Sequence, residues 1–239
     1  MNNIADKIEY PVIVNKYLAL KKISSRKEAD RLLKAGKIMV NGKLAEPGQM
    51  IDKGDRVEVD QGDKNLVYLA FNKPRGIITH SPQEGERSIA DILRFHEKVF
   101  PIGRLDKMSS GLIILTNDGR ITDKLLNPDF FHEKEYEVDV DRPITQEFLK
   151  QMAAGVELDD GYVTKKCRIK KLREKTFLII LTEGKKHQIR RMCDALGQKV
   201  VDLHRLRIMN IALNGLPAGK YRQLVGPELK VFLKSLGLA

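Results

Sequence analysis

A carboxylate next to a guanidinium is the first feature of this sequence that suits chemistry. Residues 103–106 read Gly-Arg-Leu-Asp, and after Lys-Met-Ser-Ser-Gly comes the apolar run 112–115. This order predicts Asp106 at the mouth of a buried strand, where a carboxylate can act as a nucleophile or a base. The guanidinium of Arg104 would favour its ionised form. The same residues also suit an ordinary turn, because Asp before Ser-Ser-Gly is common there.

Apolar runs predict the strands that would position Asp106. Buried strands are expected at 66–71, 112–115 and 177–181. Alternation at 136–140 and the Asp-Asp-Gly turn at 159–161 predict half-exposed strands. Helices are expected at 145–152, 187–196 and 227–236. Together these elements predict an α+β domain on a mixed, largely antiparallel sheet.

The first sixty residues predict a smaller helix-helix-hairpin unit. Helical spacing indicates a helix at 14–20, and a capping box from Ser25 to Glu28 begins a second helix that Gly36 ends. The Asn41-Gly42 pair between two apolar segments predicts a type I′ hairpin turn.

Positive charge is concentrated in this small unit. The chain carries a formal net charge of +11, and residues 16–43 hold nine Lys and Arg against two acids, a net charge of +7. A Lys-rich helix is often only a solvated face, but dense charge of one sign on a small unit favours an RNA partner. The candidate RNA contacts are Lys16, Lys21, Lys22, Arg26, Lys27, Arg31, Lys34, Lys37, Asn41 and Lys43. Phosphate contacts of this kind position a protein without reading sequence.

Length and composition favour two globular domains. The chain has 239 residues, of which 42% are hydrophobic, and the polar segment 61–65 is the expected linker. No apolar run approaches the roughly 20 residues of a spanning helix, and the first residues lack a signal peptide's apolar core. We therefore expect a cytoplasmic protein with no membrane partner.

The sequence predicts neither a metal nor a cofactor. Cys167 and Cys193 have no partner at metal-ligand spacing, and they form no disulfide framework. No Gly-rich phosphate loop or dinucleotide fingerprint is present in the sequence. A reaction that needs no metal, no nucleotide and no redox cofactor fits this pattern.

Four motifs in a fixed order carry a resemblance that covers nearly the whole chain. They are residues 71–76, 103–115, 134–136 and 183–192, the last reading Glu-Gly-Lys-Lys-His-Gln-Ile-Arg-Arg-Met. In this order they resemble the pseudouridine synthases of the RsuA/RluB/RluE/RluF group, and the RluF branch most. The first residues resemble the S4 RNA-binding domain. The resemblance implies an S4 domain at 1–62 and a catalytic domain at 63–239.

The resemblance also assigns roles to single residues. It implies that Asp106 is the essential carboxylate, acting on a uridine flipped out of the RNA stack. Attack at C1′, attack at C6 and removal of a ribose proton all remain open. Arg190 is implied to pair with Asp106, Tyr136 to stack on the flipped base, and Arg104 to fill the gap in the RNA stack. Two further motif positions are implied to shape the pocket, Lys73 and Ile189.

The implied substrate is large-subunit ribosomal RNA, with a transfer RNA anticodon stem-loop as a second candidate and small-subunit ribosomal RNA as the runner-up. A monomer is expected. Two other classes remain open: an RNA-binding protein with an inactive scaffold, and a hydrolase that releases the base. The intact Asp106, Tyr136 and Arg190 argue against the first. A hydrolase usually needs a second carboxylate to activate water, and none accompanies this motif.

Overall fold

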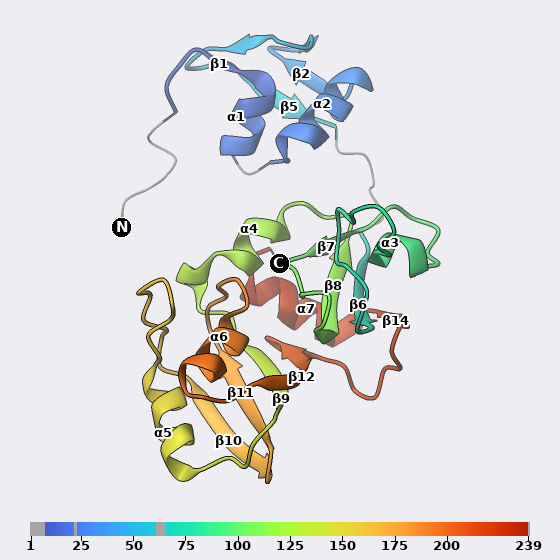
Figure 1. The fold of residues 1–239 in the computed structure, drawn as a ribbon. Helices are drawn as coiled ribbons and strands as arrows, with labels where there is room; N and C mark the ends of the chain where they lie inside the picture. The colour runs from blue at the N-terminus through green and yellow to red at the C-terminus, as the bar shows by residue number, and fades with distance from the viewer. Residues whose placement is uncertain (1–7, 22, 61–65, 239) are drawn as a thin grey trace. The chain divides into compact units, whose positions relative to one another are not determined.

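The computed structural model describes residues 8–21, 23–60 and 66–238 (Figure 1). The chain divides into two compact units, a first unit of residues 1–66 and a second unit of residues 67–239. The prediction placed the domain boundary after residue 62, and the expected linker at 61–65 lies outside the described residues, as does Lys22. No helix among the residues described is long and apolar enough to span a membrane.

The first unit contains the two helices and the hairpin that the sequence predicts. Its elements are β1 (Val12–Ile13), α1 (Val14–Leu20), α2 (Arg26–Lys34), β2 (Ile38–Val40), β3 (Lys43–Leu44), β4 (Met50–Ile51) and β5 (Val57–Val59). Ser25 caps α2 by accepting a hydrogen bond from the Glu28 backbone N–H at 3.2 Å. Asn41 and Gly42 both have positive φ, 52° and 78°, which confirms the type I′ turn.

The helix-helix-hairpin description of the first unit was incomplete. β1 pairs with β4, and β5 adds a third strand beside the hairpin in the order β3-β2-β5. These extra strands have only two or three residues each, too few for period-two alternation to stand out in the sequence. Residues of these strands and of the two helices form a hydrophobic core that includes Val14, Leu18 and Ile38.

The second unit is built on one mixed sheet. Its strands are β6 (Tyr68–Lys73), β7 (Phe100–Ile102), β8 (Ser110–Thr116), β9 (Lys134–Val140), β10 (Arg168–Arg173), β11 (Thr176–Leu181), β12 (Val200–Ile208), β13 (Ile211–Ala212) and β14 (Tyr221–Gln223). The main order is β10-β11-β9-β12-β8-β6-β14, with β7 on β8 and β13 on β12. Only the β12–β8 pair is parallel among the described strands, which confirms the predicted mixed, largely antiparallel sheet.

The helices of the second unit are α3 (Ile89–Ile92), α4 (Ile121–Leu126), the 3₁₀ helix η2 (Pro128–Phe130), α5 (Gln146–Ala154), α6 (Gln188–Ala195) and α7 (Gly226–Ser235). The three helices predicted for this unit are present as α5, α6 and α7, whereas α3, α4 and the 3₁₀ helix were not predicted. The Asp159–Gly161 turn is present, but it is flanked by one isolated bridge, Glu157 to Val163, and not by the strands we expected.

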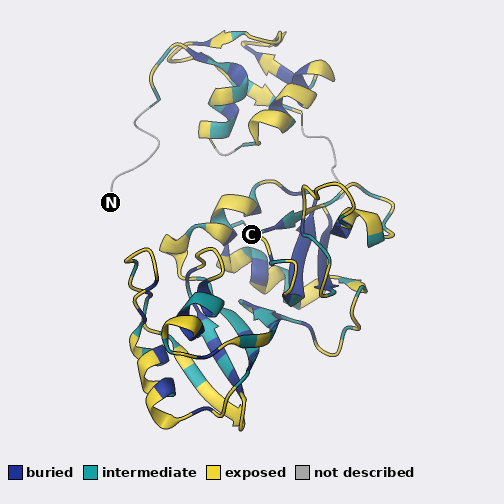
Figure 2. Ribbon diagram, viewed as in Figure 1, coloured by how far each residue is buried: buried dark blue, intermediate teal, exposed yellow. Residues whose placement is uncertain are grey.

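The apolar runs mark strands that are buried on both faces. Along β8, Leu112 and Ile114 pack into one core cluster while Ile113 and Leu115 pack into another. Figure 2 shows β6 and β8 as the continuous buried centre of the second unit. β6 runs on to Lys73, two residues beyond the predicted end, because Asn72 and Lys73 still pair with β8; Lys73 is fully buried there.

Candidate active site

Asp106 lies in the tight loop that joins β7 to β8, which are antiparallel neighbours in the sheet. The hydroxyl of Thr79 donates to the Leu105 carbonyl at 2.8 Å and accepts from the Leu105 N–H at 3.1 Å. The Gly76 N–H donates to the Lys107 carbonyl at 2.7 Å. The loop is therefore fixed on both sides of Asp106 by the segment that follows β6.

One row of residues crosses the centre of the sheet in register. Tyr136 of β9 is opposite Arg205 of β12, Arg205 is opposite Gly111 of β8, and Gly111 is opposite Lys73 of β6. A Cβ on Gly111 would stand 2.3 Å from the Arg205 carbonyl oxygen. Glycine is therefore required for β12 to approach β8 this closely, and the row brings an aromatic ring and two cations together.

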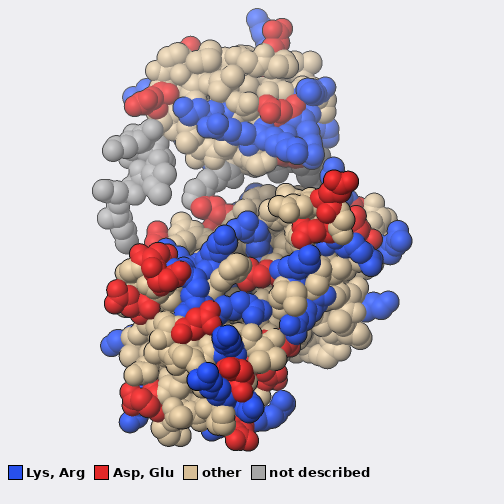
Figure 3. Space-filling view, viewed as in Figure 1, with Lys and Arg blue, Asp and Glu red and all other residues tan. Residues whose placement is uncertain are grey.

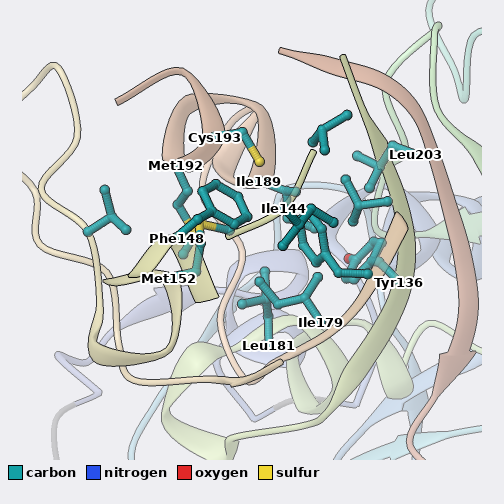
Figure 4. Packing of buried hydrophobic residues seen from close by; sticks show 14 of the residues in the cluster. Tyr136, Ile144, Phe148, Met152, Ile179, Leu181, Ile189, Met192, Cys193 and Leu203 are labelled. Atoms are coloured by element: carbon teal, nitrogen blue, oxygen red, sulfur yellow. The ribbon is translucent and has the colours of Figure 1, made fainter. Parts of the chain in front are cut away.

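A hydrophobic cluster fixes one side of this row. Tyr136 and Ile189 pack with residues of α5, α6 and β11, including Phe148 and Met192 (Figure 4). The guanidinium of Arg205 lies 6.0 Å from the centre of the Tyr136 ring. The ring is therefore held between an apolar core and a positive charge.

The loop and the row border one cleft of about 740 Å³. Four of the predicted site residues line it: Arg104, Asp106, Tyr136 and Ile189. Lys134 and Arg205 also line it. A volume of this size falls within the range of sites that hold small ligands.

The cleft is bordered by more positive charge than the neighbouring carboxylate balances. Arg205 is 4% exposed; its Nε donates to the Leu112 carbonyl at 2.6 Å, while its buried Nη2 finds no hydrogen-bond partner among the described residues. Burial and, to a smaller extent, the charge of Arg205 together lower the pKa of the Lys134 ammonium to about 8. Such buried, incompletely neutralised cations favour an anionic or strongly polar ligand.

Lys73 lies behind the cleft wall. Its ammonium donates to the carbonyls of Pro74 and Ile77 at 2.9 and 2.6 Å. Burial lowers the Lys73 pKa to about 8, the Asp106 carboxylate acts to raise this pKa, and Arg205 acts to lower it. The Lys73 ammonium thus interacts electrostatically with Asp106 while its hydrogen bonds hold the chain that follows β6.

Comparison with known proteins decides what this arrangement is. The family model for RNA pseudouridylate synthase matches residues 67–195, and the model for the S4 domain matches residues 14–57. The dual-specificity RNA pseudouridine synthase RluF of Escherichia coli strain K12 is 46% identical over 225 residues, covering 91% of this chain and 77% of that protein. The chain belongs to the RNA pseudouridine synthase family.

Other relatives agree with this assignment. An RNA pseudouridine synthase of Aquifex aeolicus is 36% identical and covers 95% of this chain and 96% of that protein. The ribosomal large subunit pseudouridine synthase B of Bacillus subtilis is 34% identical, covering 91% and 93%. A crystal structure of a pseudouridylate synthase, 26% identical, superposes with a TM-score of 0.69 over 94% of this chain and 99% of that one. The predicted family and fold class are therefore confirmed, and the chain is an enzyme that acts on RNA.

The structure does not place Arg190 in the pairing with Asp106 that the resemblance implied. The Arg190 guanidinium donates to the carbonyls of Val200 and Met108, each at 3.2 Å, and to the Ser109 hydroxyl at 3.4 Å. No ion pair joins it to Asp106, although both side chains belong to the part of the chain that is described. Through these three hydrogen bonds the Arg190 guanidinium connects the Asp106 loop to β12. Arg190 does not line the cleft.

The imidazole of His187 contacts Asp106 directly. Its Nε2 lies 3.4 Å from the carboxylate Oδ1, and both side chains are partly exposed in the cleft. His187 precedes α6 with a left-handed backbone, φ 53°, which turns the residue before α6 toward the loop. This contact was not predicted from the sequence.

Sequence reasoning also missed Arg205 and Lys134. Arg205 lies on β12, whose polar residues hid the strand from a search for apolar runs. Lys134 stands two residues before Tyr136 on β9, so both point to the same face of the sheet. That spacing was visible in the sequence and could have placed Lys134 beside Tyr136.

The predicted RNA contacts of the first unit are mostly exposed. Lys16, Lys21, Arg26, Lys27, Arg31, Lys34 and Lys43 are exposed, and Lys37 is half-buried. Figure 3 shows a band of Lys and Arg along one side of this unit. Asn41 is engaged within the unit, donating to Asp55 at 2.8 Å and accepting from the Arg56 N–H at 2.9 Å. Its amide therefore stabilises the hairpin.

Proposed function

We propose that this synthase converts a uridine of large-subunit ribosomal RNA to pseudouridine, with Asp106 as the essential carboxylate. One observation carries the proposal: Asp106, Tyr136 and Arg205 line the same cleft, although they come from three separate segments of the chain. A carboxylate, an aromatic ring and a buried cation are the groups that a flipped nucleoside requires for attack, stacking and orientation.

The geometry supports a role for each group. A base entering the cleft meets the ring of Tyr136, whose position is fixed by the core behind it. Arg205 lines the same cleft, so its guanidinium would supply a charged donor for a carbonyl oxygen of the base. Asp106 is then available to the ribose or to the ring, and attack at C1′, attack at C6 and proton removal all fit this placement.

The likeness to RluF supports the choice of substrate. That relative is named a dual-specificity enzyme, and a second relative is named for the ribosomal large subunit. We propose a transfer RNA anticodon stem-loop as the second substrate. The exposed cations of the first unit would hold the RNA by its phosphates while the second unit receives the uridine.

The test is to replace Asp106 with Asn. Transcripts of large-subunit ribosomal RNA, small-subunit ribosomal RNA and transfer RNA are incubated with wild-type protein, and pseudouridine is mapped by carbodiimide modification and reverse transcription. Asp106→Asn should lower the rate of isomerisation by more than about 10³-fold, because only the ionisable oxygen is lost. RNA affinity should stay within about twofold, because the size of the side chain is unchanged.

Asp194→Asn is the matched control, because Asp194 is exposed on α6 and lies outside the cleft. It should isomerise uridine at the wild-type rate. Conversion by Asp106→Asn at the wild-type rate would contradict the assignment of the carboxylate. Modification of small-subunit RNA alone would contradict the substrate, and release of free uracil would indicate a hydrolase.

A further inference from the structure

Two phenylalanine rings are exposed close to the cleft. Phe130 is 49% and Phe131 is 57% exposed. They directly follow Pro128 and Asp129 of η2, which line the cleft. Large aromatic side chains are rarely left in water beside a site unless they contact a ligand.

The backbone and a neighbouring lysine hold Phe131 in this position. Phe131 has a left-handed conformation, φ 53° and ψ 33°, which a bulky residue seldom adopts. Such conformations persist where the surroundings enforce them, and they gather at functional sites. The ammonium of Lys165 lies 4.2 Å from the centre of the Phe131 ring, and Lys165 itself lines the cleft.

A second pair of the same kind lines the cleft. The ammonium of Lys185 lies 4.2 Å from the centre of the Tyr162 ring, and the Tyr162 hydroxyl donates to Glu183 at 2.6 Å. Within the described ranges neither lysine has a carboxylate at ion-pair distance. Both ammonium groups therefore keep their charge available to a phosphate, while their alkyl chains cover aromatic rings.

We propose that Phe131, together with Phe130 and Lys165, is a stacking platform for an unpaired RNA base next to the flipped uridine. The proposal rests on the proposed function, since flipping one nucleotide leaves its neighbours without a stacking partner. An exposed ring stacks on the base, and the lysine contacts the adjoining phosphate. Aromatic rings beside cations are how proteins bind single-stranded RNA without strict sequence preference.

The lack of tryptophan in this chain allows a direct test. Phe131→Trp introduces a single indole, whose fluorescence should be quenched when a stem-loop of large-subunit ribosomal RNA with unpaired loop uridines is bound. Val231→Trp is the control, because Val231 is 51% exposed on α7 and lies outside the cleft. Its emission should not change. Equal quenching in both variants would overturn the platform.

A second set of variants measures what the stacking contributes. Phe131→Ala should bind the stem-loop about tenfold more weakly, and Phe131→Tyr should restore binding. Both should bind a fully paired duplex as wild type does. Equal affinity of Phe131→Ala and wild type for the stem-loop would overturn the platform, provided that both unfold at the same temperature. If no RNA is isomerised but stem-loop binding still quenches Phe131→Trp and not Val231→Trp, the proposed function fails and the platform stands.

Discussion

The two units of this synthase hold their positive charge in opposite ways. In the first unit the described Lys and Arg side chains are mostly exposed, and their ion pairs, such as Arg31 to Glu28 at 3.5 Å and Arg56 to Glu58 at 2.6 Å, lie at the surface. In the second unit Lys73 and Arg205 are buried beneath the cleft, and burial holds the pKa of Lys73 near 8. Charge in water is easily screened by salt, whereas charge in the interior is screened much less.

This difference separates two tasks. Exposed cations attract the phosphate backbone from any direction and leave it free to move, so they provide affinity without register. Buried cations are oriented before the substrate arrives, so they fix one polar group in one place. The first unit should therefore govern how tightly RNA binds, and the second should govern what happens to one uridine.

The largest effect is expected from a substitution in the central sheet of the second unit. Gly111→Ala adds a Cβ 2.3 Å from the Arg205 carbonyl oxygen at a backbone φ of 106°. It should destabilise the second unit by about 3 kcal/mol or more, which lowers its melting temperature by roughly 10 °C. Scanning calorimetry of the full chain measures this, and the transition of the first unit should not move.

Gly119→Ala is the control for that experiment. A Cβ added at Gly119 would meet no atom within 4 Å beyond its two chain neighbours, and its φ is not in the left-handed region. This variant should melt at the wild-type temperature. An unchanged melting temperature for Gly111→Ala would show that the close approach of β12 to β8 is not a constraint.

The next largest effect is expected when exposed positive charges are removed from the first unit. Replacing Arg26, Lys27 and Arg31 together by Gln should weaken RNA binding about tenfold to a hundredfold at low salt. It should also reduce the slope of log Kd against log salt by about 2 to 3, one unit or slightly less for each lost phosphate contact. Binding measured across a salt series gives both quantities.

A triple variant of the second unit provides a matched control. Lys150, Lys230 and Lys234 are exposed outside the cleft, and changing them to Gln removes the same net charge. Their loss should leave the salt slope nearly unchanged. Equal slopes in the two triple variants would mean that total charge, and not the position of the charges in the first unit, controls binding.

The smallest effect concerns the interior charge of Lys134. Burial lowers the pKa of this ammonium to about 8, so it is charged at pH 7 and mostly neutral at pH 9. Because the neutral form attracts RNA less, kcat/KM should fall about tenfold between pH 7 and pH 9. Lys134→Arg should keep its charge and lose less activity over this range. Identical alkaline profiles for the two proteins would exclude Lys134 as the group that titrates.

Much of the fold could be predicted because its signals are local. The capping box at Ser25, the Asn41-Gly42 turn and the apolar run at 112–115 each depend on neighbours in sequence, and each is confirmed. β12 could not be found in this way. It pairs with β9 along most of its length and with β8 at His204 and Arg205, so its burial depends on strands distant in the chain.

Site residues that belong to sequence motifs were predicted, whereas a residue that reaches the cleft only through tertiary packing was missed. Asp106 and Tyr136 stand in recognisable motifs, and the structure places both at the cleft. Arg190 stands in a motif too, yet its three acceptors come from β12 and the Asp106 loop, so its contacts depend on tertiary structure. Arg205 becomes a site residue only because Gly111 lets its strand approach.

The pairing order of the sheet determines how late in translation the cleft of the second unit can form. Lys73 and Arg205 are more than 130 residues apart in the chain, and they meet only when β12 has paired with β8. The cationic segment 16–43 leaves the ribosome long before β12 is made, and domains generally fold from the N-terminus during synthesis. We therefore expect the nascent chain to bind RNA well before it can isomerise a uridine.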